Sequence, residues 1–291
     1  MHSPRHFSPP AGAPPLAAPP RAAPRRTLGQ PLNPPLRDWQ HRRVWLIGAS
    51  TGIGAATAAA LHARGAQVLV SARKADALQT FVAQHAGAPG TRAAQAWPLD
   101  VTDGAAVART TQAILAEGPL DLVLYCAGHY REMRATGIDL ADMQQHLAIN
   151  YTGALHVLGA ALPALIERGQ GHVSLISSVA GFRGLPKSLA YGPTKAALTN
   201  LAETLYLDLQ PLGLGVSVVH PGFVQTPLTA QNDFTMPALI TPAQAAQAMI
   251  DGWAAGAFDI HYPKRFTRWM KLLRLLPYRV YFPAVRRFTG L

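Results

Sequence analysis

Short apolar runs alternate with longer segments of helical character from residue 43 onward. Each run is apolar throughout rather than at every second position, which is typical of strands buried on both faces of a sheet. The predicted strands are 44–47, 67–70, 94–98, 122–125, 173–176 and 216–219. Between them, the pattern predicts helices near 53–63, 74–84, 103–117, 139–167 and 189–210. Strands that alternate with helices, joined by right-handed crossovers, predict an α/β fold with a doubly wound parallel sheet flanked by helices.

The segment before this region has a different composition. Residues 1–40 contain eleven prolines mixed with Ala and Arg, and proline removes the hydrogen bonds that helices and sheets need. We therefore expect residues 1–41 to form a disordered Pro/Ala/Arg-rich tail. The tail lacks the apolar core of a secretory signal, and its prolines disfavour an amphipathic transit helix. The predicted folded domain then spans residues 42–261.

Residues 262–291 are predicted to form a basic amphipathic extension. One helical face carries Phe266, Trp269, Met270, Leu272, Leu273 and Leu276, and the other carries Lys264, Arg265, Arg268, Lys271 and Arg274. A cationic helix with aromatic and leucine anchors resembles helices that lie on anionic membrane surfaces. Alternatively, the apolar face packs on the same chain or on a second subunit, and both interpretations stay open. A membrane-spanning helix is not expected, because no apolar run reaches roughly 18 residues.

The excess positive charge lies at the two ends of the chain. The formal net charge is +11, but residues 1–43 hold seven Lys/Arg against one acid, and residues 261–291 hold eight against none. The middle of the chain is therefore net −3, and we expect no nucleic-acid partner, because such domains usually carry their basic patch on the fold. The single cysteine, Cys126, excludes an internal disulfide and a thiolate cluster. We expect no metal site and a cytoplasmic location, with peripheral contact at the inner membrane face if the extension binds lipid.

A glycine-rich turn, Gly48-x-x-x-Gly52-x-Gly54, follows the first predicted strand and opens the first helix. Glycine lets the backbone turn tightly and approach a pyrophosphate, and the start of a helix supplies free N–H groups. The turn alone is a weak signal, because ordinary strand–helix turns also use glycine. In this strand–helix context it favours a Rossmann-like nucleotide site.

The second predicted strand ends in Ser71, Arg73 and Lys74, with no acid before Asp76. NAD-binding folds usually place an acid here for the ribose 2′-hydroxyl, whereas a basic residue accommodates a 2′-phosphate. Arginine can hold a phosphate through two hydrogen bonds, so the segment predicts NADP(H); the alternative is a solvated helix start. Asp100, after the third strand, is suited to accept from an adenine amino group or to cap the next helix, and the two uses are compatible.

Tyr191 and Lys195 are separated by four residues at the start of a predicted helix, so both side chains lie on one face. A free tyrosine has a pKa near 10, and a nearby ammonium group favours the phenolate and lowers that pKa. Such a pair is suited to proton transfer near neutral pH. For this spacing alone, an exposed tyrosine and lysine at a helix start is the alternative interpretation.

Five motifs occur in one order between residues 43 and 260. They are Gly48-x-x-x-Gly52-Ile53-Gly54, Asn150-x-x-Gly153, Ser178, Tyr191-x-x-x-Lys195 and Pro221-Gly222. In this order and spacing the chain resembles the short-chain dehydrogenase/reductase family, in its single-domain, NADP(H)-dependent branch. Two positions depart from the family pattern: Cys126 stands where asparagine is frequent, which weakens local sheet support, and Ile47 stands where threonine is frequent.

The resemblance implies a role for each catalytic residue. Tyr191 exchanges a proton with the substrate oxygen, Lys195 lowers the pKa of Tyr191 and binds the ribose hydroxyls, and Ser178 rather than Ser177 hydrogen-bonds the substrate. Asn150 holds a water that relays protons through Lys195. The expected cofactor-binding residues are Gly48, Ser50, Thr51, Gly52, Ile53, Gly54, Ser71, Arg73, Lys74, Asp100, Val101, Ala127, Gly128, Tyr191, Lys195, Pro221, Gly222, Val224 and Thr226.

These features predict an NADP(H)-dependent oxidoreductase that interconverts a carbonyl and an alcohol. The segment 227–239 falls where the family has a substrate-covering loop, and its apolar residues are Leu228, Phe234, Met236, Pro237 and Leu239. An apolar or lipid-like substrate is one interpretation, and simple packing of a closed loop is the other. A non-catalytic NADP(H)-binding redox sensor or membrane scaffold is the alternative function, although a pure binder needs no acid–base pair. The resemblance also implies a homo-oligomer.

Overall fold

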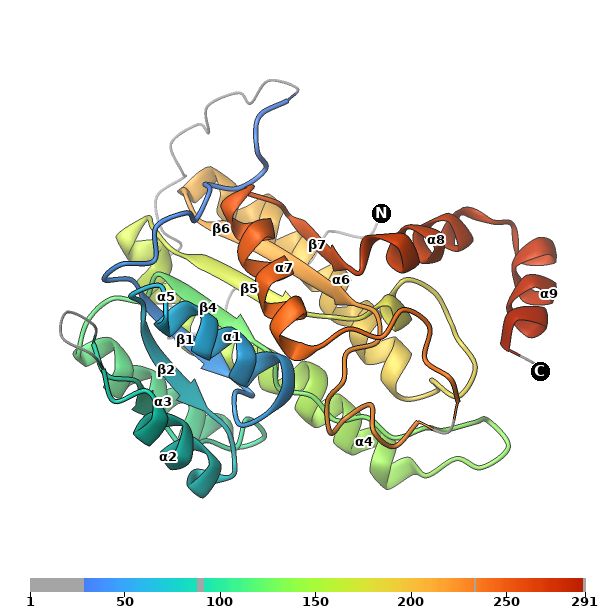
Figure 1. Ribbon diagram of the computed structural model, residues 1–291, viewed down its shortest axis with the longest axis horizontal. Coiled ribbons are helices and arrows are strands. Elements are labelled where there is room, and N and C mark those ends of the chain that lie inside the picture. The colour runs from blue at the N-terminus through green and yellow to red at the C-terminus, as the bar shows by residue number, and fades with distance from the viewer. Residues whose placement is uncertain (1–28, 88–91, 233, 290–291) are drawn as a thin grey trace, which may run out of the picture.

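The computed structural model describes residues 29–87, 92–232 and 234–289. Seven parallel strands form one sheet in the order β3-β2-β1-β4-β5-β6-β7 (Figure 1). The strand order reverses between β1 and β4, which is the doubly wound arrangement that the pattern of runs predicts. The strands are β1 (Arg43–Ile47), β2 (Gln67–Ser71), β3 (Gln95–Ala96), β4 (Leu122–Tyr125), β5 (His172–Ile176), β6 (Gly215–Pro221) and β7 (Asp259–Tyr262).

Helices cover both faces of the sheet, and each face has its own hydrophobic core. The core on one face contains side chains of α1 (Gly52–His62), α2 (Ala75–Gln84) and α7 (Pro242–Ala254). The core on the other face contains side chains of α3 (Gly104–Ala116), α5 (Gly153–Arg168) and α6 (Tyr191–Leu209). The Rossmann-like fold expected from the sequence is confirmed, because parallel strands buried on both faces need helices on both sides.

The helix expected over 139–167 is divided into three parts. α4 (Leu140–Leu147) passes into one π-helical stretch, Ala148–Thr152, before α5 begins. The whole segment Leu140–Arg168 is long and apolar enough to cross a membrane by length and composition, with a mean hydropathy of 1.4. Its inner side packs into the core of the domain, so this is the core helix of the α/β fold.

Two elements near the end of the domain were not predicted. α7 begins with a capping box, in which Thr241 accepts from the backbone N–H of Gln244 and the Gln244 side chain accepts from the backbone N–H of Thr241. That Thr-x-x-Gln pattern is a sequence signal for a helix start. β7 is the edge strand, and its residues alternate between partial and full burial. With four residues and two histidines, it lacks the continuous apolar run by which the other strands were recognised.

The segment 33–39 belongs to the folded domain, contrary to the tail boundary expected at residue 41. The side chain of Asn33 accepts from the backbone N–H of Val216 at 2.9 Å and donates to its carbonyl oxygen at 2.7 Å. Leu36 is buried, and the ring of Trp39 meets that of Trp253 edge-on. These long-range contacts outweigh the local effect of the prolines. Residues 1–28, the rest of the expected tail, lie outside the described residues.

The extension forms two helices, α8 (Lys264–Leu275) and α9 (Tyr278–Thr289), which lie at the end of the molecule away from α2 and α3 (Figure 1). The single apolar face expected for α8 is divided between two environments. Phe266, Met270 and Leu273 are partly buried, whereas Trp269 is 68% exposed and Leu272 is 56% exposed. The inner residues therefore pack on the same chain, and the outer ones form an unpartnered apolar surface among arginines.

Candidate active site

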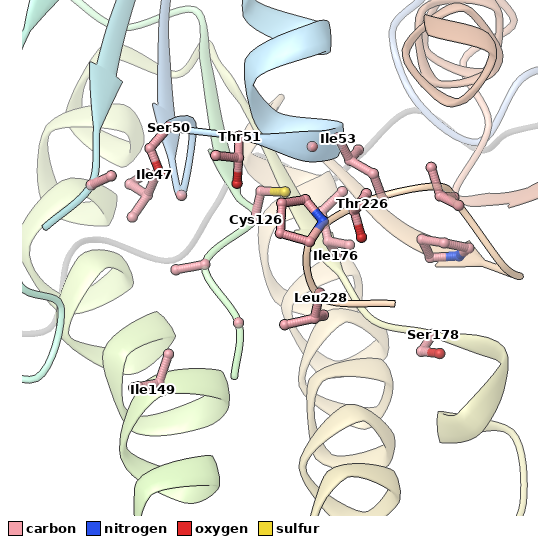
Figure 2. Close-up of a pocket in the computed structure, with 18 of the residues that line it drawn as sticks. Ile47, Ser50, Thr51, Ile53, Cys126, Ile149, Ile176, Ser178, Thr226 and Leu228 are labelled. Carbon is pink, nitrogen blue, oxygen red and sulfur yellow. The ribbon is translucent and has the colours of Figure 1, made fainter. Parts of the chain in front are cut away.

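A pocket of about 380 Å³ opens at the carboxyl ends of the strands. The order of the sheet reverses here, and this is the usual position of ligand sites in doubly wound folds. Figure 2 shows Ser50 and Thr51 in the turn before α1 at one end of the pocket and Ser178 at the other end. Thr226 and Leu228 lie between them. The sequence motifs, far apart along the chain, are thus brought around one space.

The glycines of the first turn are required by close backbone contacts. Gly48 has φ +88°, and a Cβ there would lie 2.6 Å from the Cα of Ala127. Gly52 has φ +59°, and its Cβ would lie 2.9 Å from the Cγ2 of Thr226. A Cβ on Gly54 would overlap the carbonyl oxygen of Gly48, so this glycine sets the packing of helix against strand rather than lining the pocket.

The start of α1 leaves backbone donors directed at the pocket. Thr51 is the N-cap residue, and its side chain makes no capping hydrogen bond. The first N–H groups of a helix have no partner within the helix and form its positive end. The observed cradle, in which Gly48 and Gly52 carry no Cβ beside Ser50 and Thr51, therefore fits the phosphates of a dinucleotide.

Arg73 and Lys74 line the same end of the pocket and are exposed. Among the described residues, neither forms an ion pair, so both cations are available to an anion. Ser71, also expected here, does not line the pocket: its buried hydroxyl accepts from the indole N–H of Trp45 at 2.9 Å. Ser71 is the last residue of β2, and its side chain lies on the same face of the sheet as Trp45. The turn after Ser71 carries the exposed side chains of Arg73 and Lys74.

Asp100 lines the pocket but does not cap α3. Its Oδ1 accepts from the backbone N–H and the hydroxyl of Thr102, and Asp103 is the N-cap instead. Burial would raise the pKa of Asp100, but the hydrogen bonds from Thr102 and the charge of Arg73 outweigh burial and lower it. The carboxylate stays ionised and keeps Oδ2 for another donor. Val101 beside it is buried and lines the pocket.

The two serines after β5 have different environments. The hydroxyl of Ser177 donates to the carbonyl oxygen of Lys195 at 2.7 Å and bonds that of Thr199 at 2.9 Å, so it ties β5 to α6. Ser178 lines the pocket together with Tyr191, near enough for its hydroxyl to favour the phenolate and act to lower the tyrosine pKa. Ser178, the residue chosen by its distance from Tyr191 along the chain, is therefore the one beside the tyrosine.

Tyr191 and Lys195 lie on one face of α6, with the ammonium nitrogen 5.5 Å from the ring centroid. Nζ of Lys195 donates to the carbonyl oxygen of Ile176 at 2.8 Å, and burial lowers the lysine pKa to about 8. Burial raises the pKa of Tyr191, and the hydroxyl of Ser178 only partly opposes this. The direction is opposite to that expected from the spacing, because desolvation of the phenolate is the largest contribution.

Asn150 lies in the π-helical stretch and contacts the site indirectly. Its side-chain amide donates to the carbonyl oxygen of His129 and to the hydroxyl of Thr194, both at 3.0 Å, and its Oδ1 accepts from the N–H of His129. Single π-helical turns are frequent at functional sites. Gly153, three residues later, leaves room for the Tyr125 side chain, because a Cβ would lie 2.5 Å from its hydroxyl. The Asn-x-x-Gly motif thus joins α4 and α5 to the segment after β4.

A buried network of His129, Asp142 and His146 lies beside Tyr191. His129 Nε2 bonds Asp142 at 2.7 Å, and the ring of His146 meets that of Tyr191 edge-on. The ligand atoms of all three residues lie within 4.8 Å of one another, as metal ligands would. However, His146 bonds the carbonyl oxygen of Asp142 through Nδ1 and accepts from the N–H of Arg131 through Nε2. Neither ring nitrogen of His146 is left for a metal ion, so the group is a hydrogen-bonded network.

The segment after β6 closes the pocket on the side of Ser178. Pro221, Gly222, Val224 and Thr226 all line the pocket, and the N–H of Gly222 donates to the carbonyl oxygen of Tyr262 at 2.7 Å. Thr229 was not expected here, but its hydroxyl donates to the carbonyl oxygen of Val224 and accepts from the N–H of Thr226. A Thr-x-x-Thr pattern at the start of the loop was the available signal.

Most expected cofactor residues therefore meet in one pocket, and Ser71 and Gly54 are the ones that do not line it. Asn150, expected as a catalytic residue, does not line it either. Ala127 and Gly128 line it after β4, next to Cys126, whose pKa burial raises to about 11. The sequence did not indicate the apolar wall. It includes four residues whose sequence pattern is that of core residues: Ile47 and Ile176 at strand ends, Leu99 after β3, and Ile149 in the π-helical stretch.

The fold and the pocket together define the class of protein: a Rossmann-type oxidoreductase with a tyrosine–lysine–serine site. The family model of the short chain dehydrogenases matches residues 42–236. The chain belongs to the short-chain dehydrogenase family.

Known relatives agree over most of the chain. An uncharacterized oxidoreductase of Myxococcus xanthus is 34% identical over 255 residues, which are 87% of this chain and 99% of that protein. The 2-keto-3-deoxy-L-fuconate dehydrogenase of Xanthomonas campestris pv. campestris is 32% identical over 206 residues, 70% of this chain and 65% of that protein. The crystal structure of a short-chain dehydrogenase from Streptomyces avermitilis superposes with a TM-score of 0.73 at 26% identity, and covers 86% of this chain and 97% of that one. The protein is accordingly an oxidoreductase.

Proposed function

We propose that this protein is an NADP(H)-dependent oxidoreductase that interconverts a carbonyl and an alcohol, with Tyr191 as acid–base. The observation that carries the proposal is that Ser178, Tyr191 and Lys195 line one end of a pocket whose other end is a glycine cradle. A nicotinamide cofactor bound in this pocket would supply or accept the hydride. The residues of the cradle and the strand ends would hold it.

Tyr191 is suited to give its proton to a carbonyl oxygen. Because burial raises its pKa, the hydroxyl keeps the proton across neutral pH. Ser178 would bind the same oxygen and orient the carbonyl between the two hydroxyls. Lys195, with its pKa lowered to about 8, would stabilise the tyrosinate that remains and return a proton to it. In the reverse direction, the same groups would remove the alcohol proton.

The proposed mechanism is tested by replacing Tyr191 with phenylalanine. The Tyr191→Phe variant should lose more than about 100-fold in NADPH-dependent carbonyl reduction, the scale of general acid–base catalysis, and should bind NADPH as the unchanged protein does. Tyr206→Phe is the matched control, because it removes a tyrosine hydroxyl of the same helix that donates to the carbonyl oxygen of Leu32, away from the pocket. Turnover retained in Tyr191→Phe would sink the mechanism. Tight NADPH binding without turnover of any carbonyl would favour a redox sensor or scaffold.

The proposed preference for NADP(H) depends on Arg73 and Lys74. Both are exposed at the end of β2, where a 2′-phosphate is usually held, and a carboxylate at that position would repel it. Arg73→Asp should shift the ratio of kcat/KM values from NADPH toward NADH by at least tenfold. Arg64→Asp, a charge reversal just after α1 and away from the pocket, is the control. An unchanged ratio in Arg73→Asp would refute the cofactor assignment.

An apolar, lipid-like carbonyl is the proposed substrate. The loop after Thr226 presents Leu228 to the pocket, and its Phe234 is 42% exposed beside Phe223, 5.6 Å between ring centroids. Aldehydes of increasing chain length should therefore show rising kcat/KM, with roughly 0.8 kcal/mol available per buried methylene. A flat dependence on chain length would contradict an apolar substrate site.

We also propose that the outer face of α8 and α9 rests on an anionic membrane surface, with the protein in the cytoplasm. Trp269, Leu272 and Leu275 are exposed beside Arg265 and Arg268, a pattern that suits lipid headgroups and the upper acyl region. A double change of Trp269→Ser and Leu272→Ser should reduce pelleting with phosphatidylglycerol vesicles. The control, Leu140→Ser, removes a leucine of α4 that is 65% exposed. Equal pelleting of all three proteins would exclude this contact.

A homo-oligomer is the proposed assembly. α6 presents Leu207, which is 72% exposed, and α5 presents Leu155, which is 39% exposed. Light scattering after gel filtration should give a mass of at least two chains, and Leu207→Asp should lower it. A monomer at micromolar concentration would contradict the assembly.

A further inference from the structure

The C-terminal extension, defined as α8 and α9, contacts the segment that joins Ser178 to Tyr191. This joining segment, residues 182–190, begins after the short helix Val179–Gly181 and ends at the start of α6. Its second residue is Arg183. Because the segment connects two residues that line the same end of the pocket, its position acts directly on their spacing.

Arg183 caps the C-terminal end of α8. Its Nη1 donates to the backbone carbonyl oxygens of Leu273 at 3.3 Å and Arg274 at 3.1 Å, and also to that of Leu276. The last carbonyls of a helix lack partners within the helix and form its negative end. A guanidinium group, which is always charged and carries several donors in one plane, is well matched to this position.

Two tyrosine rings of α9 contact the same guanidinium group. Its central carbon lies 4.0 Å from the ring centroid of Tyr281 and 4.4 Å from that of Tyr278. Aromatic faces attract cations, and more strongly when water is excluded. Tyr281 is buried, and its hydroxyl donates to the carbonyl oxygen of Gly184 at 2.7 Å. Both helices of the extension therefore hold the joining segment.

α8 is in turn tied to the sheet. Lys271 forms an ion pair with Asp259 of β7, and the other oxygen of Asp259 bonds His220 of β6 at 2.9 Å. Phe266 packs on the backbone of Gly222, where an added Cβ would lie 2.8 Å from the ring. The helix that Arg183 caps is thus anchored to β7 and to β6, whose Pro221 lines the pocket, and the cap transmits that position to the joining segment.

We infer that Arg183 is a positioning residue, through which the C-terminal extension holds Ser178 and Tyr191 at their catalytic spacing. The inference rests on the reductase activity proposed above. The glycine cradle at the other end of the pocket is built from different elements, so loss of Arg183 should lower kcat and leave NADPH affinity unchanged. A displacement of about 1 Å at reacting groups can reduce a rate about 100-fold.

The experiment compares Arg183→Leu, Arg183→Lys and Tyr281→Phe with the unchanged protein. Leucine removes the charge and the donors, and lysine keeps the charge but lacks the planar group that reaches several carbonyls and stacks on rings. Arg183→Leu should lower kcat about 10- to 100-fold with the Kd for NADPH within twofold. Arg183→Lys should recover only part of kcat, and Tyr281→Phe should lose several-fold. Arg109→Leu, which removes an exposed arginine of α3 away from the pocket and the extension, should match the unchanged protein.

Amide hydrogen exchange of the cofactor-free protein gives a second readout that does not depend on turnover. Residues 182–190 should exchange faster in Arg183→Leu and Arg183→Lys, while β1 exchanges as before. Unchanged kcat in the folded variants would overturn the inference, and so would a parallel loss of kcat and NADPH affinity. If Arg183→Leu does not fold, Arg183→Lys and Tyr281→Phe carry the test. If the protein without substitutions shows no turnover, the proposed reductase activity is refuted. Faster exchange at residues 182–190 in the Arg183 variants would still support the positioning contact.

Discussion

Replacing Gly48 with alanine tests how closely the cofactor turn is fitted to the segment after β4. Two separate penalties apply at this position. The backbone has φ +88°, and a residue with a Cβ costs roughly 1–2 kcal/mol in the left-handed region. The new Cβ would also lie 2.6 Å from the Cα of Ala127 and 2.7 Å from the carbonyl carbon of Cys126.

The second penalty cannot be relieved by rotating a side chain, because the contacted atoms belong to the backbone. The N–H of Cys126 donates to the carbonyl oxygen of Ile47 at 2.8 Å, which fixes that backbone next to β1. Overpacking of this kind typically costs about 1–3 kcal/mol. Together the two effects should lower the free energy of unfolding by about 2–5 kcal/mol, a large part of the usual 5–15 kcal/mol.

Two control variants separate the two penalties. Gly169→Ala also meets a positive φ, +65°, but its Cβ would lie 3.8 Å from the nearest atom, so it should lose only roughly 1–2 kcal/mol. Gly54→Ala has ordinary φ but overlaps the carbonyl oxygen of Gly48, so it should show the overlap penalty alone. Urea unfolding measures all three, and NADPH titration should show weaker binding for Gly48→Ala and Gly54→Ala but not for Gly169→Ala. If Gly48→Ala lost no more stability than Gly169→Ala, the close approach of the two backbones would be refuted.

Two further predictions concern buried polar groups. Because burial lowers the pKa of Lys195 to about 8, the unfolded chain binds more protons above that pH, and stability should rise between about pH 8 and 9 by up to ~1.4 kcal/mol per pH unit. Lys195→Met should remove this rise of stability with pH in urea-unfolding curves, and an unchanged slope below pH 9 would contradict the assignment. Above pH 9 the raised pKa of Cys126 changes stability in the opposite direction. Asn33→Ala should cost about 1–3 kcal/mol in chemical unfolding, because it leaves the buried N–H of Val216 without its partner. Leu32→Ala, at an exposed neighbouring position, should cost less than about 0.5 kcal/mol, and equal losses would show that the Asn33 contact contributes little.

Several residues show why the local pattern was informative about the site. Gly48 and Gly52 were recognised because a strand–turn–helix connection imposes its own backbone conformation, whatever packs around it. Ser178 was distinguished from Ser177 by its spacing to Tyr191, and the structure brings it beside the tyrosine. Ser71 and Asp100 were placed less well. Their contacts depend on the direction in which each side chain points at the end of a strand. Ser71 hydrogen-bonds Trp45, which is distant in sequence, and Asp100 hydrogen-bonds Thr102, two residues later.

The sequence by itself determined where the first six strands and the helices between them lie along the chain. It also determined the positions of the cofactor turn and of Tyr191 and Lys195. These features depend on local periodicity and backbone conformation, which neighbouring residues already express. Only the tertiary structure decided that burial raises the pKa of Tyr191, that the apolar face of α8 is divided between core and solvent, and that Arg183 joins the extension to the active site. Desolvation, helix capping and stacking depend on groups that are distant in sequence, so no pattern along the chain contains them.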